Sequence, residues 1–147
     1  MLGRQAIHAL KALLELADDP ARWRSVRDLA ETQDLPAPML EQLLLQLRRG
    51  GLLEARRGRL GGYRLARAAG AISVASVLRA LDHELAAGLE PTGDGTVGAA
   101  DRVAGLLEGR LRDAVERELE RCTLAELHFD LRSAWAALSE EGGLLLG

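Results

Sequence analysis

The stretch that decides the fold is residues 34–67, which read DLPAPMLEQLLLQLRRGGLLEARRGRLGGYRLAR. Four leucines recur in it at the i, i+3, i+4, i+7 spacing of one helix face: Leu40, Leu43, Leu44 and Leu47. Its prolines suit a first helical turn, where backbone N–H groups have no partner, and the glycine pair 50–51 is typical of a helix end. Residues 52–57 and 62–66 then predict two short strands joined by the turn 58–61.

Arginines are concentrated in the second part of this stretch. Residues 48–67 contain seven arginines and a single acidic residue, Glu54. A helix followed by a hairpin with a basic tip is the geometry of a winged helix-turn-helix. In that fold the helix enters the major groove of DNA, and the hairpin, or wing, reaches a neighbouring minor groove. Upstream, Ser25 is a good N-cap for a helix over 26–33, and the turn 34–35 completes the helix-turn-helix. The sequence therefore predicts a mainly α fold with a two-stranded wing.

Apolar periodicity predicts further helices on both sides of this unit. They span residues 3–17, 74–85, 99–121 and 124–138. The tail 139–147 shows no clear period. Residues 88–98 form a Gly-rich loop, and we interpret its G-x-G-x-x-G pattern as a loop because no strand precedes it. We expect a DNA-binding domain over 1–87 and a dimerisation helix with a C-terminal helix over 99–147.

The helix over 99–121 carries more apolar surface than the small N-terminal half is expected to cover. This favours a homodimer with the interface residues Val103, Leu107, Leu111 and Val115. Two interior glycines, Gly105 and Gly109, suit close approach of a second helix, since each costs about 1 kcal/mol relative to alanine. The alternative is that the apolar stripe packs on its own domain.

The net charge of −3 hides an uneven distribution. Residues 1–70 carry twelve Lys or Arg and eight Asp or Glu, whereas residues 71–147 carry seven and fourteen. A locally basic face, rather than the total charge, decides contact with DNA phosphates. No apolar run is long enough to span a membrane, no signal peptide is evident, and one cysteine excludes an internal disulfide. We therefore expect a cytoplasmic protein without membrane contact. No nucleophile elbow or H-E-x-x-H motif indicates an enzyme.

Several of these residues resemble the Rrf-two (Rrf2) family of bacterial transcription regulators. The matching pieces are Leu35-Pro36, Leu40-Glu41-Gln42-Leu43, Leu47-Arg48, Gly51-Leu52, Arg57-Gly58, Gly61-Gly62-Tyr63 and Thr123-Leu124-Ala125-Glu126-Leu127. They cover the recognition helix, the wing and a later helix start, so the resemblance spans about residues 1–127. It implies a dimeric DNA-binding regulator in which the helix over 99–121 is the dimerisation helix.

The residues and the resemblance together select candidate DNA contacts. Arginine suits phosphates and narrow minor grooves, so Arg57 and Arg59 are expected at the minor groove, and the resemblance supports Arg57. Glu41 and Gln42 are expected at base edges, and the resemblance makes Glu41 the specificity-determining glutamate. Four further residues are candidate phosphate contacts: Ser25, Arg27, Arg48 and Arg49. Two helix-start residues are also DNA-contact candidates, although they depart from the residues usual in the family: Pro38 and Met39. The alternatives are a merely solvated basic turn, and a Glu41 that only pairs with a nearby arginine.

The resemblance also raises the question of an iron–sulfur cluster. Relatives that bind one carry three cysteines between the helix that braces the wing and the dimerisation helix, with a histidine after them, but residues 86–100 contain neither residue type. A cluster needs several thiolate or imidazole ligands, so we expect no cofactor. Two alternatives stay open: a metal site across the dimer from His8 or His83 with Asp82 or Glu84, and redox sensing by Cys122.

The sequence thus predicts a dimeric, sequence-specific transcription regulator, which we interpret as a repressor. Two recognition helices are expected in successive major grooves of a pseudo-palindromic operator in double-stranded DNA. An unknown small-molecule or protein effector at the Gly-rich loop or the dimerisation helix would change their spacing. A second hypothesis is a protein-interaction adaptor that kept the fold and lost DNA recognition, which the negative net charge favours. Steeply salt-dependent DNA binding distinguishes the two.

Overall fold

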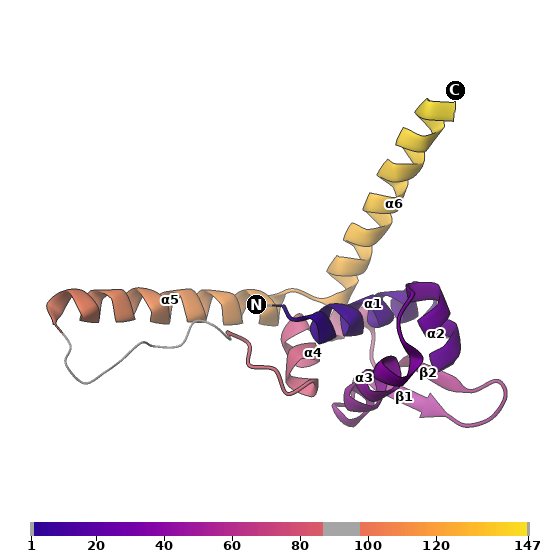
Figure 1. Cartoon of the computed structure of the whole chain (residues 1–147), viewed down its shortest axis with the longest axis horizontal. Coiled ribbons are helices and arrows are strands. Elements are labelled where there is room, and N and C mark those ends of the chain that lie inside the picture. Colours follow the sequence, from indigo (N-terminus) through magenta and orange to yellow (C-terminus); the bar gives the residue numbers. More distant parts are fainter. Residues whose placement is uncertain (1, 87–97, 147) are drawn as a thin grey trace.

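The computed structural model describes residues 2–86 and 98–146, so the predicted Gly-rich loop lies outside the described residues except for Gly98. The described chain is mainly helical with one two-stranded antiparallel sheet, as the sequence predicts (Figure 1). The elements are, in order, α1 (Arg4–Asp18), α2 (Val26–Gln33), α3 (Ala37–Arg49), β1 (Leu53–Arg56), β2 (Gly62–Leu65), the short 3-10 helix η1 (Ala69–Ala71), α4 (Val74–Ala80), α5 (Ala99–Arg121) and α6 (Leu124–Leu146).

Helices α1, α2 and α3 pack around a core of leucine and alanine. The predicted apolar face of α3 is buried, since no side chain in it is more than 2% exposed: Leu40, Leu43, Leu44 and Leu47. This face belongs to the same hydrophobic cluster as Leu13 and Leu16 of α1 and Leu29 of α2. Full burial of a leucine side chain stabilises a fold by about 1.5–3 kcal/mol. The leucine face therefore fixes α3 to the body and leaves its other side to solvent.

Local signals set the bounds of α2 and α3. Ser25 caps α2 as predicted, because its Oγ accepts a hydrogen bond of 3.0 Å from a backbone N–H of the first turn. The helix ends where Asp34 adopts a φ of 52° and turns the chain toward α3. Gly50 ends α3, and α4 packs so closely there that an added Cβ would lie 2.7 Å from the Cβ of Ala80.

The helix predicted over 74–85 ends earlier, at Ala80, so that predicted bound is wrong. Asp82 adopts a φ of 56°, and the His83 N–H bonds back to a carbonyl of α4 at 2.9 Å. The chain therefore turns away from the helix axis at this point. Leu81 and Leu85 continue the apolar spacing because both still pack against the core, although the backbone there is no longer helical.

The last helix extends beyond its predicted end at 138 and continues to Leu146. The segment after residue 138 contains serine, glutamate, glycine and leucine but no proline. Without a proline an existing helix continues through this segment even where no regular apolar face forms, although each glycine costs about 1 kcal/mol relative to alanine. The absence of a regular apolar spacing therefore did not predict the backbone conformation of this segment.

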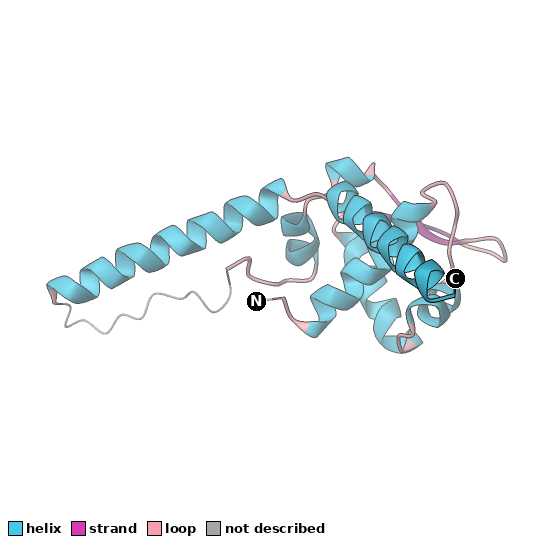
Figure 2. Ribbon diagram, turned by 90° about the horizontal axis from the view of Figure 1, so that it is seen from above, coloured by secondary structure: helices cyan, strands magenta, loops and turns pink. Residues whose placement is uncertain are grey.

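The two long helices leave the body in different directions (Figures 1 and 2). α5 extends away as an arm and packs against α4, whereas α6 packs against α1 and η1 and then projects on the side away from α3 and the wing (Figure 1). The joint between them is bonded to the segment before α4. There the Val74 N–H donates to the Cys122 carbonyl at 2.9 Å, and the Leu124 N–H donates to the Ile72 carbonyl at 2.8 Å. No helix in the described residues is long and apolar enough to cross a membrane.

Candidate nucleic-acid interface

The wing is a tight hairpin whose tip is fixed by glycine. β1 and β2 pair antiparallel, within one residue of the predicted strand bounds. The Gly61 N–H donates to the Gly58 carbonyl at 3.1 Å, which closes the predicted turn. Gly58 has a φ of 107°, and a Cβ added to Gly61 would overlap the carbonyl of Arg56. The central residues of this turn, Arg59 and Leu60, therefore form the far end of the wing.

A backbone bridge ties the part of β2 next to the turn to the loop between α1 and α2. The Arg24 N–H donates to the Tyr63 carbonyl at 2.9 Å, and the Tyr63 N–H donates to the Arg24 carbonyl at 2.7 Å. The bridge needs glycine at position 62, because Gly62 has a φ of 138° and an added Cβ would overlap the Arg24 carbonyl. This bridge sets the orientation of the wing relative to the helix-turn-helix.

Trp23 adds a second tie between the same loop and the wing. Its ring centroid lies 4.2 Å from the guanidinium carbon of Arg64 and 5.8 Å from that of Arg56, within the range of cation–π attraction. Arg64 also pairs with Glu54 on the neighbouring strand. Arg67 donates to a backbone carbonyl at 3.3 Å. Three of the seven arginines in residues 48–67 therefore have structural contacts.

Arg24 is a buried charged residue, only 7% exposed, that holds this loop in place. Its guanidinium donates to Glu15 of α1 at 3.0 Å, to Thr32 of α2 at 3.3 Å, and to Asp28 of α2. Burial opposes the charge, but the hydrogen bonds to Asp28 and Glu15 outweigh burial and raise the pKa of Arg24 above its usual value. One side chain thus joins two helices of the body to the loop that carries the wing bridge.

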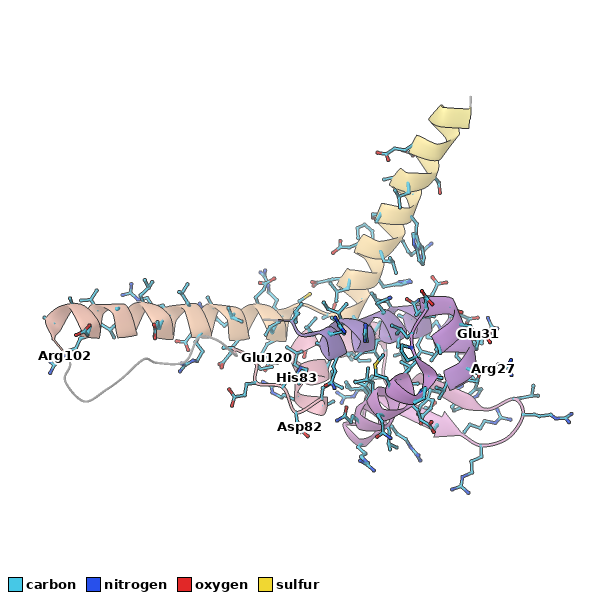
Figure 3. The ribbon with its side chains drawn as sticks, viewed as in Figure 1. Arg27, Glu31, Asp82, His83, Arg102 and Glu120 are labelled. Atoms are coloured by element: carbon cyan, nitrogen blue, oxygen red, sulfur yellow. The ribbon has the colours of Figure 1, made fainter. Side chains whose placement is uncertain are left out.

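The other four arginines are exposed, and within the described part of the chain they have no ion pair, hydrogen bond or ring contact: Arg48, Arg49, Arg57 and Arg59. They come from the last turn of α3 and from the wing tip. Figure 3 shows nitrogen-tipped side chains extending from α3 and from the wing on the same side of the molecule. Exposed cations without protein partners are available to DNA phosphates.

The predicted DNA-contacting residues in the first part of α3 differ in exposure. Pro38, Glu41 and Gln42 are exposed on the outer side of the helix. The structure shows no ion pair between Glu41 and an arginine among the residues it describes, so the Glu41 carboxylate is available to a base edge. Met39 differs, because its half-buried side chain packs against the hydrophobic core.

The two candidates at the start of α2 already have intramolecular partners. The Ser25 Oγ accepts the capping hydrogen bond. Arg27 pairs with Glu31 at 3.2 Å on the outer face of α2, where Figure 3 shows both side chains. The Arg27 side chain is 88% exposed. An exposed pair of this kind contributes only about 0.3–0.5 kcal/mol, so Arg27 is readily released to a phosphate.

The apolar stripe of α5 divides into a covered part and an uncovered part. Four of its side chains are between 46% and 66% exposed: Val103, Leu106, Leu107 and Leu111. Val115 is half-buried, and Leu119 packs against the core. The alternative in which the stripe packs on its own domain therefore describes only the C-terminal part of α5. Uncovered apolar patches of this kind mark interaction surfaces.

Metal-ligating side chains do not gather in the described residues, which contain no group of three or more His, Cys, Asp or Glu placed for a metal ion. Cys122 is half-buried at the joint between α5 and α6. Burial raises the pKa of its thiol, and the carboxylates of Glu126, Glu118 and Asp130 raise it further. The thiol is therefore protonated at neutral pH, and a protonated thiol is a poor nucleophile and a poor metal ligand.

Three residues of this region were missed by the sequence analysis. Trp23 and Arg24 contact the wing from a loop far away in the chain, and no local pattern reports such a contact. Leu60 is 82% exposed at the wing tip. The exposure of Leu60 could have been predicted from the sequence, because an apolar residue in a four-residue turn between glycines cannot reach the hydrophobic core.

Comparisons with known proteins agree with this geometry. The Rrf2 family model, described as "Iron-dependent Transcriptional regulator", matches residues 2–130. A protein of Synechocystis sp. named as an HTH-type transcriptional regulator is 40% identical over 145 residues, which cover 96% of this chain and 95% of that protein. The HTH-type transcriptional regulator IscR of Erwinia tasmaniensis is 34% identical over 126 residues, which cover 85% of this chain and 74% of IscR.

Two solved structures share the winged-helix fold. CymR, the global cysteine regulator of B. subtilis, matches with a TM-score of 0.73 and 28% identity over 87% of this chain and 95% of CymR. The T. potens IscR structure matches with a TM-score of 0.67 and 27% identity over 91% of this chain and 90% of that one.

Proposed function

Because this chain belongs to the Rrf2 family of helix-turn-helix transcriptional regulators, we propose that it is a homodimeric, sequence-specific DNA-binding repressor. Each protomer places α3 in a major groove and the wing in the adjoining minor groove of a pseudo-palindromic operator. The observation that carries the proposal is the set of exposed arginines without partners on α3 and the wing: Arg48, Arg49, Arg57 and Arg59.

Phosphates and bases are contacted by different residues in this arrangement. Arg48 and Arg49 lie in the last turn of α3 and neutralise phosphates, while Arg57 and Arg59 enter the minor groove from the wing tip. Glu41 accepts a hydrogen bond from cytosine N4, and Gln42 pairs with an adenine edge. Met39 supports the position of α3 from the core side rather than contacting DNA.

The dimer forms through the uncovered part of α5. In a two-fold dimer the same patch of each protomer meets its copy, so one exposed apolar face suffices for both partners. The exposed side chains of Val103, Leu107 and Leu111 supply that face, and the half-buried Val115 continues it toward the body. The acidic second half of the chain then lies away from the DNA phosphates.

We further propose that this regulator works without an iron–sulfur cluster, although the family model is described as iron-dependent. The chain holds a single cysteine, so each protomer supplies one thiolate, and burial opposes its formation at Cys122. The donor set does not fit a cluster, which needs several thiolate or imidazole ligands. The effector of this regulator is accordingly of another chemical class.

Selection of fragmented genomic DNA on the purified protein tests the proposal. The expected result is an enriched palindrome, whose affinity is then measured as a function of salt. Arg57→Ala should weaken binding and reduce the salt slope by about two, one contact from each protomer. Arg102→Ala removes the same charge near the far end of α5, as Figure 3 shows, and should leave the slope unchanged.

Transcription in vitro from a promoter that contains the selected site tests repression. Added protein should lower transcript yield, and a rise would identify an activator. No enriched DNA from a folded dimeric protein contradicts DNA recognition and favours the adaptor. If DNA is enriched but neither Arg57→Ala nor Arg102→Ala changes the salt slope, the DNA contact assigned to Arg57 is wrong.

A further inference from the structure

We propose that Leu60 is an apolar wedge that enters the minor groove of the operator and kinks the duplex. The inference rests on the proposed function and adds a specificity determinant to it. Arg57 and Arg59 attract the wing tip to the groove, and Leu60 inserts between two base steps. The residue thereby selects DNA by how readily it deforms rather than by hydrogen bonds.

The first observation is the exposure of this side chain. Leu60 is 82% exposed, more than any other large apolar side chain that the structure describes, and it does not belong to the hydrophobic core. An isolated exposed leucine is ordinary on a protein surface. This one differs in its position, because it occupies a turn where polar residues and glycine are the norm. Figure 1 shows that turn projecting beyond the body.

The second observation is the fixed geometry of the wing. An inserting side chain needs a backbone that does not retreat from the DNA. The Gly61–Gly58 hydrogen bond of 3.1 Å closes the turn on which Leu60 lies. Close to the turn, where Gly62 faces Arg56 and Tyr63 faces Ala55, the bridge between Arg24 and Tyr63 fixes the strands to the helix-turn-helix body. The wing tip is thus presented at a defined angle.

The third observation is the match between this tip and the chemistry of the minor groove. The groove is about 6 Å wide, so it admits a hairpin turn but not a helix. Its negative potential attracts Arg57 and Arg59, both of which have no protein partner among the described residues. Leucine is among the side chains that other proteins insert between base steps, which bends the duplex toward the major groove. Pyrimidine–purine steps kink most readily, so we expect them in the operator beneath each wing.

Two variants at position 60 and one at position 57 separate a wedge from a merely exposed residue. Leu60→Ser removes the apolar side chain, Leu60→Met keeps an apolar side chain of similar size, and Arg57→Ala is the charge control. None of these substitutions touches the core, so each variant should fold. DNA affinity, its salt slope and the bend angle are measured on a selected operator fragment, with the bend taken from fluorescence energy transfer between labelled ends. A 2-aminopurine base beneath the wing reports unstacking.

The wedge predicts a specific pattern of results. Leu60→Ser should bind about tenfold more weakly, with a smaller bend and without unstacking of the reporter base. Its salt slope should match that of the wild type, because no charge is removed, whereas Arg57→Ala lowers the slope. Leu60→Met should keep most of the bend and affinity.

Two outcomes overturn the inference, and they are distinguishable. If Leu60→Ser binds and bends the operator like the wild type, the wedge is wrong while the proposed function stands. If the wild-type protein selects no DNA at all, the proposed function fails and the wedge fails with it.

Discussion

Replacing Gly62 with alanine should weaken the attachment of the wing to the helix-turn-helix. Gly62 has a φ of 138°, a backbone region that alanine rarely adopts, and an added Cβ would overlap the carbonyl of Arg24. The hydrogen bonds of 2.9 and 2.7 Å between Arg24 and Tyr63 lie directly beside this overlap. The variant therefore loses stability by two routes, because the bridge must open to relieve the overlap and alanine is strained at this φ.

The size of the effect follows from these two routes. Each backbone hydrogen bond contributes about 0.5–1.5 kcal/mol net, so opening the bridge costs about 2 kcal/mol. Holding alanine at such a φ costs about 1–3 kcal/mol. Alanine recovers about 0.4–1 kcal/mol by restricting the unfolded chain. The two costs together, less this recovery, should lower the free energy of unfolding by about 2–4 kcal/mol, which leaves a domain of ordinary stability folded.

Urea denaturation followed by circular dichroism measures this loss, at one fixed protein concentration because association changes the apparent stability. The matched control is Gly58→Ala. Gly58 also has a positive φ, of 107°, but an added Cβ there meets nothing within 4 Å. The control should lose only the conformational part, about 1 kcal/mol. The difference between the two variants isolates the overlap with Arg24.

Equal losses of stability in the two variants would refute this reasoning, because the contact between the wing and Arg24 would then contribute nothing. Operator affinity gives a second measurement. Without urea the Gly62→Ala protein is folded and keeps all its charges, but its wing has lost its fixed orientation. Its affinity should therefore fall below that of the Gly58→Ala protein.

The remaining predictions test the buried Arg24, the α5 interface and the Cys122 thiol. In urea denaturation, Arg24→Met should lower the free energy of unfolding by about 1–3 kcal/mol, because it removes the hydrogen bonds of a buried guanidinium and leaves two partly exposed carboxylates without their cation. The exposed Arg27→Met should change it by less than about 0.5 kcal/mol. In light scattering, the Leu107→Asp protein should be monomeric. The control Leu60→Asp, which alters a leucine away from α5, should stay dimeric. A dimeric Leu107→Asp protein contradicts the α5 interface. At pH 8 the Cys122 thiol should react with iodoacetamide more slowly than a small free thiol, because its pKa is raised. Since the folded state resists ionisation of this thiol, stability should fall as pH rises above about 8.5, and Cys122→Ser should remove that fall.

The DNA-binding half was largely predictable because its signals act over short distances. The spacing of Leu40 and its partners selects one face of α3, and the Ser25 cap places the start of α2 at the predicted residue. The wing turn is encoded by Gly58 and Gly61, which supply a positive φ and a close backbone approach. Each of these features depends on a few neighbouring residues, so a pattern in the sequence is enough to find it.

The errors and omissions have a different physical origin. Leu81 and Leu85 keep the apolar spacing of a helix because Leu81 is buried and the half-buried Leu85 packs against the core, although the backbone has already turned at Asp82. Periodicity reports burial, and burial does not require the helix to continue. The contact between Trp23 and Arg64 joins segments far apart in the chain, so it is decided by the tertiary fold and leaves no local signal.

The joint at the base of α5 determines how a signal could reach the DNA. Leu124 is 1% exposed and belongs to the same core as the leucine face of α3. The backbone bonds that Val74 and Leu124 make across the joint hold it to the segment before α4, and the Arg79–Glu120 ion pair joins α4 to α5. The base of α5 therefore does not tilt independently of its own DNA-binding body. In a dimer held by α5, the spacing of the two α3 helices depends on how the two α5 helices pair. An effector that changes operator affinity through that spacing must act on this pairing.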